Sequence, residues 1–457
     1  MKIRSLLLGS VAAAGLSTGA FAADLGVLTS LDVCDALGLS GLTISSDTNC
    51  LQITGEVKYN FTWGDYNDED LVVDTPADGG VGFFGGDGYN DFKSKFDAYI
   101  KFVATADSDF GPAKAVLKLR EKNYKLATGG YYYDTNSSSY YEGFLTSQGS
   151  GNTGLYFDEA YVSIGDSTVI MAGKKGSIMN KADDEPLNWL GLFNSEDVDT
   201  GVSWGPYVEL PDGGHVIQVT SDLGNGVSVS AGLENLDGSS HDWDLSNEDD
   251  RPGTAVGVIA YSGEGISAHL TGAIGGILDG DIDNWGVHAG FTGTFDNFKV
   301  VLAGAYGHNE YYDDDYWNVL ASASATFDIF TIAASFEAVD YSDSDDTDFG
   351  AGASITAAVA EGVTLNVGGR WFHYADGDVD NFQVAASVSA AVTESITLTG
   401  EVGYVDGDYD SLFYGSAKLA WAPGGGYTSS IKGTVNSGTD DQDVGYKIET
   451  EFKKTFE

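Results

Sequence analysis

Residues 51–63 read Leu-Gln-Ile-Thr-Gly-Glu-Val-Lys-Tyr-Asn-Phe-Thr-Trp. The odd positions of this stretch are apolar, glycine or aromatic, and the even positions are all polar. Because successive side chains of a β-strand point to opposite faces, the pattern predicts a strand with one polar and one apolar face. The same alternation returns in residues 91–106 and 113–122. The chain is therefore predicted to be all-β.

Short turns and longer acidic loops alternate along the second half of the chain. The turns are predicted near Gly263–Gly265, Asp296–Asn297, Asp328–Ile329, Glu361–Gly362, Thr393–Ser395 and Pro423–Gly426. Between them lie the acidic loops Asp313–Asp315, Asp340–Asp348, Asp376–Asp380, Asp406–Asp410 and Asp440–Asp443. This rhythm is typical of a transmembrane antiparallel β-barrel. We expect an even number of strands between 16 and 20, and the pattern itself, which includes a weak hairpin near residues 215–233, counts 20.

Aromatic residues mark the face that meets lipid. Trp285 and Phe295 lie ten residues apart on one face of a predicted strand, and Trp317 and Phe327 repeat the arrangement. Ten tilted residues cover about 23 Å of membrane normal, close to the roughly 25 Å apolar band between aromatic girdles. Aromatic residues of a soluble sheet core would not need to keep to the strand ends. We therefore expect the apolar face to point outward.

The polar face of the first strands is rich in basic residues. It carries Lys58, Lys93, Lys95, Lys101, Lys114, Lys118, Arg120 and Lys122. An unpaired charge that is buried costs several kcal/mol, so this face must be wet. A solvated outer face is the alternative, but the opposite face is too apolar and too extended to fill a small core. Barrels of 16 or more strands leave an aqueous channel, which satisfies both faces.

The N-terminus has the features of a secretory signal. Lys2 and Arg4 precede an apolar run, and Ala20-Phe21-Ala22 fits a cleavage site, so residues 1–22 are predicted to be removed. Residues 23–50 would form a periplasmic segment and residues 51–457 the barrel. The mature chain carries 20 basic residues (22 minus two) against 69 acidic residues, a net charge of −49 that excludes nucleic acid as a partner.

The two cysteines of the chain, Cys34 and Cys50, lie just after the signal. An exported chain meets an oxidising compartment, so a Cys34–Cys50 disulfide is expected. A metal site is not expected there, because no histidine lies nearby.

Catalytic and cofactor chemistry find little support in the sequence. The six histidines lack metal-ligand spacing, and no nucleophile or paired base stands out, so we expect neither an enzyme nor a bound cofactor. The acidic loops could bind Ca²⁺ or Mg²⁺ weakly and bridge to lipopolysaccharide phosphates, or they could simply be solvated. A surface adhesin or a structural surface-layer protein is the alternative function, which richness in Gly, Asp and Thr fits and the lysine face does not.

Three segments resemble the alphaproteobacterial outer-membrane porins of Brucella and Rhizobium type. They are Val33-Cys34-Asp35-Ala36 with Thr48–Val57, Phe157–Gly165, and Met171-Ala172-Gly173-Lys174-Lys175. The resemblance implies a homotrimer of 16-stranded barrels in the outer membrane, in contact with lipid and lipopolysaccharide. It also implies that the third loop folds inward and constricts each pore. The chain departs from the family by ending Phe456-Glu457 and not on the aromatic residue itself.

The residues that would form this constriction follow from the resemblance. Lys174 would extend the basic wall, and the third loop would run from about residue 177 to 213. Its acidic residues are Asp183, Asp184, Glu185, Glu196, Asp197 and Asp199. Carboxylates facing a basic wall would create a transverse field in a passive, water-filled channel for small hydrophilic solutes and ions.

Overall fold

The computed structural model describes residues 32–66, 90–134, 139–148, 154–181, 185–194, 213–237, 253–278, 280, 282, 284–310, 313–342, 346–375, 377–407, 411–437 and 444–457. The predicted signal peptide lies outside these residues. No helix among them is long and apolar enough to cross a membrane.

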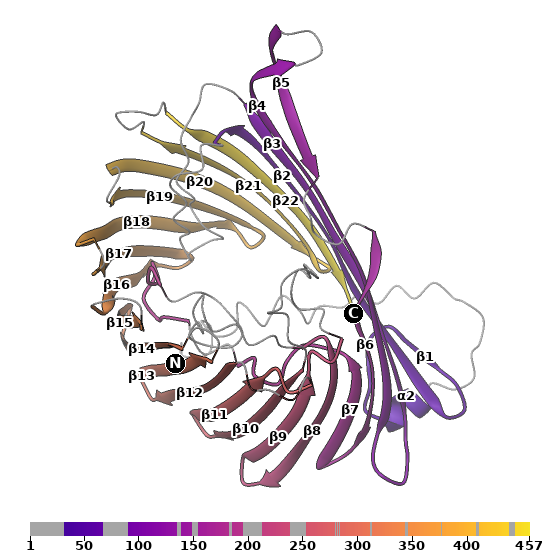
Figure 1. Cartoon of the computed structure of the whole chain (residues 1–457). Helices are drawn as coiled ribbons and strands as arrows, with labels where there is room; N and C mark the ends of the chain where they lie inside the picture. Colours follow the sequence, from indigo (N-terminus) through magenta and orange to yellow (C-terminus); the bar gives the residue numbers. More distant parts are fainter. Residues whose placement is uncertain are drawn as a thin grey trace.

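A closed ring of antiparallel strands makes up the described fold (Figure 1). Twenty strands form the ring, which closes where the first of them, β2, pairs with the last, β22. The count of 20 from the sequence pattern is therefore confirmed, and the 16 strands that the resemblance implied are not found. The strands of the ring are β2 (Asn49–Asp65), β3 (Asp91–Ala106), β4 (Ala113–Asp134), β6 (Leu155–Gly165), β7 (Thr168–Lys174), β8 (His215–Gly224), β9 (Val227–Glu234), β10 (Thr254–Gly263), β11 (Ile266–Gly275), β12 (Asn284–Phe295), β13 (Phe298–Asn309), β14 (Asp314–Phe327), β15 (Phe330–Tyr341), β16 (Asp348–Ala360), β17 (Val363–Tyr374), β18 (Val379–Thr393), β19 (Ile396–Asp406), β20 (Ser411–Gly424), β21 (Tyr427–Asn436) and β22 (Tyr446–Phe456).

The predicted short turns lie where the pairing requires them. Phe295 pairs with Phe298 and Phe327 with Phe330, which leaves two residues for each turn. The weak hairpin of β8 and β9 is also present and turns at Asn225 and Gly226. Asn225 has φ 53° and Gly226 φ 80°, the left-handed values that a tight hairpin turn with the native strand twist requires.

Strand β4 extends beyond its neighbours on the side opposite the short turns. Its residues 113–121 pair with β6, whereas residues 125–134 pair with β5 (Ser139–Gln148). The β4–β5 hairpin therefore projects away from the ring, as the upper part of Figure 1 shows.

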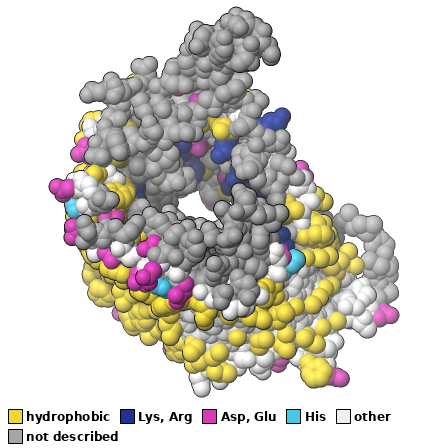
Figure 2. Space-filling view, in the orientation of Figure 1, with side chains coloured by type: hydrophobic (Ala, Val, Ile, Leu, Met, Phe, Trp, Pro, Cys, Tyr) yellow, Lys and Arg dark blue, Asp and Glu magenta, His cyan; other side chains and the backbone are white. Residues whose placement is uncertain are grey.

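The outer face of the barrel is apolar, as predicted. Leu302, Val319 and Ile332 alternate with inward residues and are 40–48% exposed on the outer face. Phe295 and Phe327 are also about half exposed, at the turn end of their strands. Figure 2 shows hydrophobic side chains covering the outer surface around a central opening. This apolar outer face is the surface that contacts lipid.

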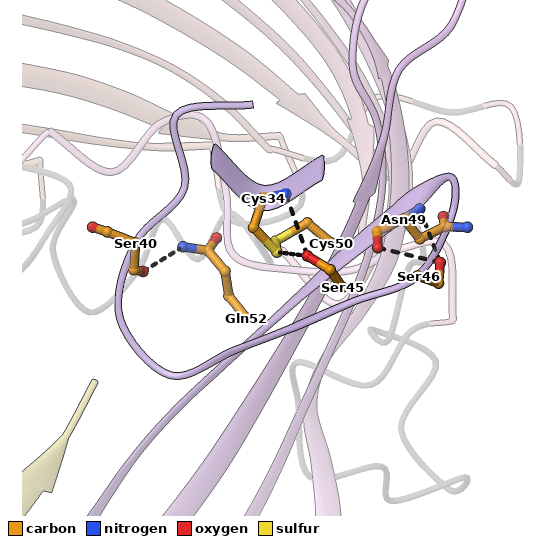
Figure 3. Close-up of a disulfide and its surroundings, with 7 residues drawn as sticks. All are labelled: Cys34, Ser40, Ser45, Ser46, Asn49, Cys50 and Gln52. Atoms are coloured by element: carbon orange, nitrogen blue, oxygen red, sulfur yellow. Dashed lines mark hydrogen bonds between the residues drawn. A yellow bond between two sulfur atoms is a disulfide. The ribbon is translucent and has the colours of Figure 1, made fainter. Parts of the chain in front are cut away.

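A disulfide-bonded lobe precedes the barrel (Figure 3). It contains α2 (Asp32–Ala36) and β1 (Thr43–Ser45), and the predicted Cys34–Cys50 disulfide is present with a Cα–Cα distance of 4.9 Å. Strand β1 pairs with residues 50–52 of β2, beyond the point where β22 ends. Asn49 pairs with Ala106 just before the β3–β4 turn, so the lobe lies on the short-turn side of the barrel.

Candidate functional site

The segment between β7 and β8 enters the lumen. Among its described residues, Met179, Leu190 and Leu192 are at most 4% exposed, and all three pack against inward-facing side chains of the barrel. Because several strands of one wall contact this segment, the third loop folds inward, as the resemblance implied.

The wall that receives the loop is more apolar than the sequence pattern suggested. Met179 packs against Val256, Val258, Ala273 and Ala305. Leu190 packs against Ala385, Val405, Leu412 and Tyr414, and Leu192 against Val301, Ala303 and Leu320. The strict expectation of a polar inner face is therefore wrong for much of β10–β20, because part of that face is covered by the loop and never meets water.

A buried carboxylate joins the two ends of the loop. Glu234 at the end of β9 is fully buried and accepts hydrogen bonds from the backbone N–H of Ile178 and of Gly213, each at 3.0 Å. Gln218 also donates to it through Nε2, at 2.7 Å. Charge-assisted hydrogen bonds of this kind are stronger than neutral ones, so Glu234 fixes both the entry and the exit of the loop.

A second buried carboxylate holds the loop farther along. Glu337 is 1% exposed and accepts hydrogen bonds from the backbone N–H of Phe193 and Asn194, both at 3.0 Å. Arg370 donates from Nη1 to the Leu192 carbonyl oxygen at 2.8 Å and places its guanidinium 4.1 Å from the centroid of the Phe193 ring. The loop is thus held by directional contacts as well as by apolar packing.

The acidic residues predicted for the loop are only partly described. Glu185 lies in the described part of the loop and is exposed. Asp183, Asp184, Glu196, Asp197 and Asp199 lie outside the described residues.

The predicted basic wall is assembled on one face of β2, β3 and β4. Lys58 is opposite Asp97, and Lys101 is opposite Lys118, so these side chains share a face. The outward neighbours Val57 and Leu117 are 45% and 46% exposed, which puts the lysine face on the inside. By strand alternation the same face carries Lys93, Lys95, Lys114, Arg120 and Lys122. Lys and Arg side chains are visible within the opening in Figure 2.

Carboxylates that were not among the predicted site residues are interleaved with the basic residues of this wall. The ion pairs are Lys58–Glu451 at 2.7 Å, Lys453–Glu56 at 2.8 Å, Arg120–Asp97 at 2.6 Å, Lys118–Asp158 at 2.6 Å and Lys101–Glu159 at 2.8 Å. Asp97 alternates in sequence with Lys93, Lys95 and Lys101, and that alternation was a usable signal. Pairings between distant strands gave no such signal.

Lys174 lies elsewhere than the resemblance implied. It pairs with Ala160 and His215 and has the strand parity of Ile170, which is 52% exposed on the outer face. The neighbouring Lys175 takes the lumen position, with Nζ 4.7 Å from the centroid of the Tyr161 ring.

Two histidines lie close together in the described part of the chain. The rings of His269 and His288 lie 4.5 Å apart on neighbouring strands. No group of three or more His, Cys, Asp or Glu side chains among the described residues could hold a metal ion.

A closed membrane barrel with a charged lumen wall and an inward loop defines an outer-membrane diffusion pore. A sequence model of the family described as "Porin subfamily" matches residues 30–443. The porin Omp2a of Brucella ovis is 27% identical over 315 residues, which cover 67% of this chain and 79% of that protein. The porin Omp2b of Brucella abortus is 27% identical over 318 residues, or 67% and 74% of the two chains. The chain therefore belongs to the porin subfamily.

The chain is also similar to solved structures, at low sequence identity. Acinetobacter baumannii OccAB4 has a TM-score of 0.46 and 9% identity, with 89% of this chain and 97% of that chain covered. The anion-selective porin from Comamonas acidovorans has a TM-score of 0.36 and 12% identity, with 89% and 100% covered.

Family membership establishes the role of the chain. It is a general-diffusion porin of the bacterial outer membrane, through which small hydrophilic solutes pass passively. The findings give no support to the adhesin alternative. Porin membership implies a channel rather than an enzyme.

Proposed function

We propose that solutes and ions pass between the inward loop, whose described residues include 175–181 and 185–194, and the basic wall of β2, β3 and β4. Transport on this path is passive and involves neither a cofactor nor a catalytic step. The loop supplies carboxylates, and the opposite wall supplies basic groups that are partly paired with carboxylates of their own. A weak transverse field between the two sides orients dipolar solutes as they pass.

The observation that carries this proposal is the position of the wall that receives the loop. In the ring of strands β4 is third and β15 is thirteenth of 20, so they lie half a circumference apart (13 minus 3 is 10). The loop packs on the side of β15, where Glu337 holds it. Among the described residues, the space that the loop leaves open lies on the side of the basic wall.

Thiol modification at the loop tests the path. Glu185 is exposed, and both native cysteines are in the disulfide, so Glu185→Cys introduces the one free thiol of the chain. Reaction with a bulky methanethiosulfonate should reduce single-channel conductance in a planar bilayer. Asp378→Cys, in the loop between β17 and β18, is the matched control and should react without a change in conductance. Full conductance after complete labelling at position 185 would remove the loop from the path.

We further propose that three copies of the chain assemble into a trimer. This proposal rests on membership of the porin subfamily. Chemical cross-linking in mild detergent should give a band of three chains that heating converts to one. A single-chain band before heating would contradict it.

A further inference from the structure

On the wall opposite the loop, one group of side chains from β3, β4 and β6 contains as many carboxylates as basic groups. Arg120 contacts Asp97 through Nη2 at 2.6 Å and Asp158 through Nη1 at 3.5 Å. Lys118 contacts Asp158 at 2.6 Å and Glu159 at 3.7 Å. Lys101 completes the group through Glu159, so three basic groups stand against three acidic groups and the formal charge is zero (3 minus 3).

A β-bulge supplies two of these carboxylates. Lys118 pairs with Glu159 and Leu119 with Phe157, which leaves Asp158 as an extra residue in β6. Consecutive residues of a regular strand point to opposite faces, whereas a bulge lets two neighbours share one face. The bulge therefore brings both Asp158 and Glu159 to the lumen side, where both reach Lys118.

The ion-paired group lies at the level of the inward loop. Ser322 and Ser354 accept hydrogen bonds from the loop backbone, five and six residues from the turn ends of β14 and β16 (327 minus 322, 360 minus 354). Lys118 and Glu159 lie five and six residues from the turn ends of β4 and β6 (118 minus 113, 165 minus 159). With equal rise per residue, both sides stand at the same height in the lumen.

We propose that Asp158 and Glu159 are specificity-determining residues of this pore. They neutralise the basic wall opposite the loop, so the narrow part of the channel does not select anions despite its lysines and arginine. The inference rests on the proposed path between the loop and the wall. The six side chains of the ion-paired group are 16–29% exposed, so they are close enough to water to act on passing ions.

Ion selectivity of neutral variants tests the proposal. Glu159→Gln and Asp158→Asn each uncover about one positive charge on the wall. The chloride-to-potassium permeability ratio should rise about two- to threefold for each substitution, the effect of a unit charge within about 10 Å of an aqueous ion path. The double variant should rise further. The measurement is the reversal potential in a dilute KCl gradient across a planar bilayer.

Charge-balanced and distant variants serve as controls. Lys118→Met added to Glu159→Gln should return the permeability ratio to the wild-type value, because the ion-paired group is then neutral again. Asp380→Asn, a carboxylate that is 61% exposed at the start of β18, should leave the ratio unchanged. Heat-modifiable migration on detergent gels verifies that each variant is folded.

Two outcomes separate this inference from the proposed path. A folded double variant with an unchanged permeability ratio overturns the role of Asp158 and Glu159, even if thiol reagents still block Glu185→Cys. A purely structural role for the ion pairs would lower the unfolding temperature without changing the ratio. If thiol reagents do not block Glu185→Cys but the permeability ratio still shifts in the double variant, the loop does not border the path. The role of Asp158 and Glu159 in selectivity would then stand.

Discussion

The ring of Phe456 lies over the backbone of Gly55, its partner across the β2–β22 pair that closes the barrel. A Cβ atom added at Gly55 would lie 2.3 Å from Cζ of Phe456 and 2.8 Å from the carbonyl oxygen of Tyr99. The glycine at position 55 therefore gives the ring of Phe456 room at the closing pair.

Substitution of this glycine should weaken closure of the barrel. Gly55→Ala forces the Phe456 ring away, and overpacking of this kind costs about 1–3 kcal/mol. We expect the variant to lose its heat-modifiable form at a lower temperature on detergent gels. Gly433→Ala is the matched control, because a Cβ there meets nothing within 4 Å. Equal melting of the two variants would contradict this account of the closing pair.

Removal of the carboxylates that hold the loop should release it from the wall. Glu337→Ala leaves the N–H groups of Phe193 and Asn194 without their acceptor, at about 1–3 kcal/mol for each buried group. Glu234→Ala should act similarly at the loop ends. We expect faster protease cleavage within residues 175–213 and noisier single-channel currents. Glu361→Ala, in the exposed β16–β17 turn, is the control and should behave as wild type. Loop cleavage at the wild-type rate in both Glu337→Ala and Glu234→Ala would refute the anchoring role of the two buried carboxylates.

Neutralisation of the loop acids should shift selectivity toward anions. Asp183→Asn, Asp184→Asn and Glu185→Gln together remove three negative charges from the proposed path. The reversal potential in a salt gradient should move in the anion direction, opposite to the effect of removing wall lysines such as Lys101. If the potential does not move, these three residues do not border the constriction.

Loss of the disulfide should affect the lobe more than the barrel. Cys34 and Cys50 are 16 residues apart, and in the chain-entropy model such a bridge contributes about 3 kcal/mol. Replacing both by Ser should raise hydrogen exchange in residues 32–54 while β10–β20 stay protected. Thiol labelling of the unreduced, denatured wild-type protein should find no free cysteine, and labelling of both would disprove the bridge.

The period of two in the sequence was enough to predict the strands, their number and the outward face. It succeeds because every strand must present an apolar face to lipid, which keeps the alternation regular from Trp285 to Phe327. The inner face of β10–β20 does not follow this alternation. Residues such as Val256 and Leu320 are apolar there because the loop covers them, and no local pattern reveals a contact with a distant segment.

The basic face of β2, β3 and β4 was predictable from strand alternation, but its charge balance was not. Lys118 and Arg120 follow the strand alternation, and so does Asp97. The bulge at Asp158 interrupts the alternation by one residue, and only the pairing with β4 locates it. Lys174 was misplaced for a related reason, because a shift of one residue reverses the face of a side chain.

The apolar contacts of the inward loop restrict how this protein could be engineered as a nanopore. Deleting the loop to widen the aperture would expose Val256, Val301, Leu320, Val405 and Leu412 to water. Each large apolar side chain that becomes exposed to water loses about 1.5–3 kcal/mol of favourable burial free energy. The loop and the wall residues that it covers thus form a hydrophobic core inside the barrel. A wider version of the pore would need polar residues grafted onto that wall before the loop could be removed.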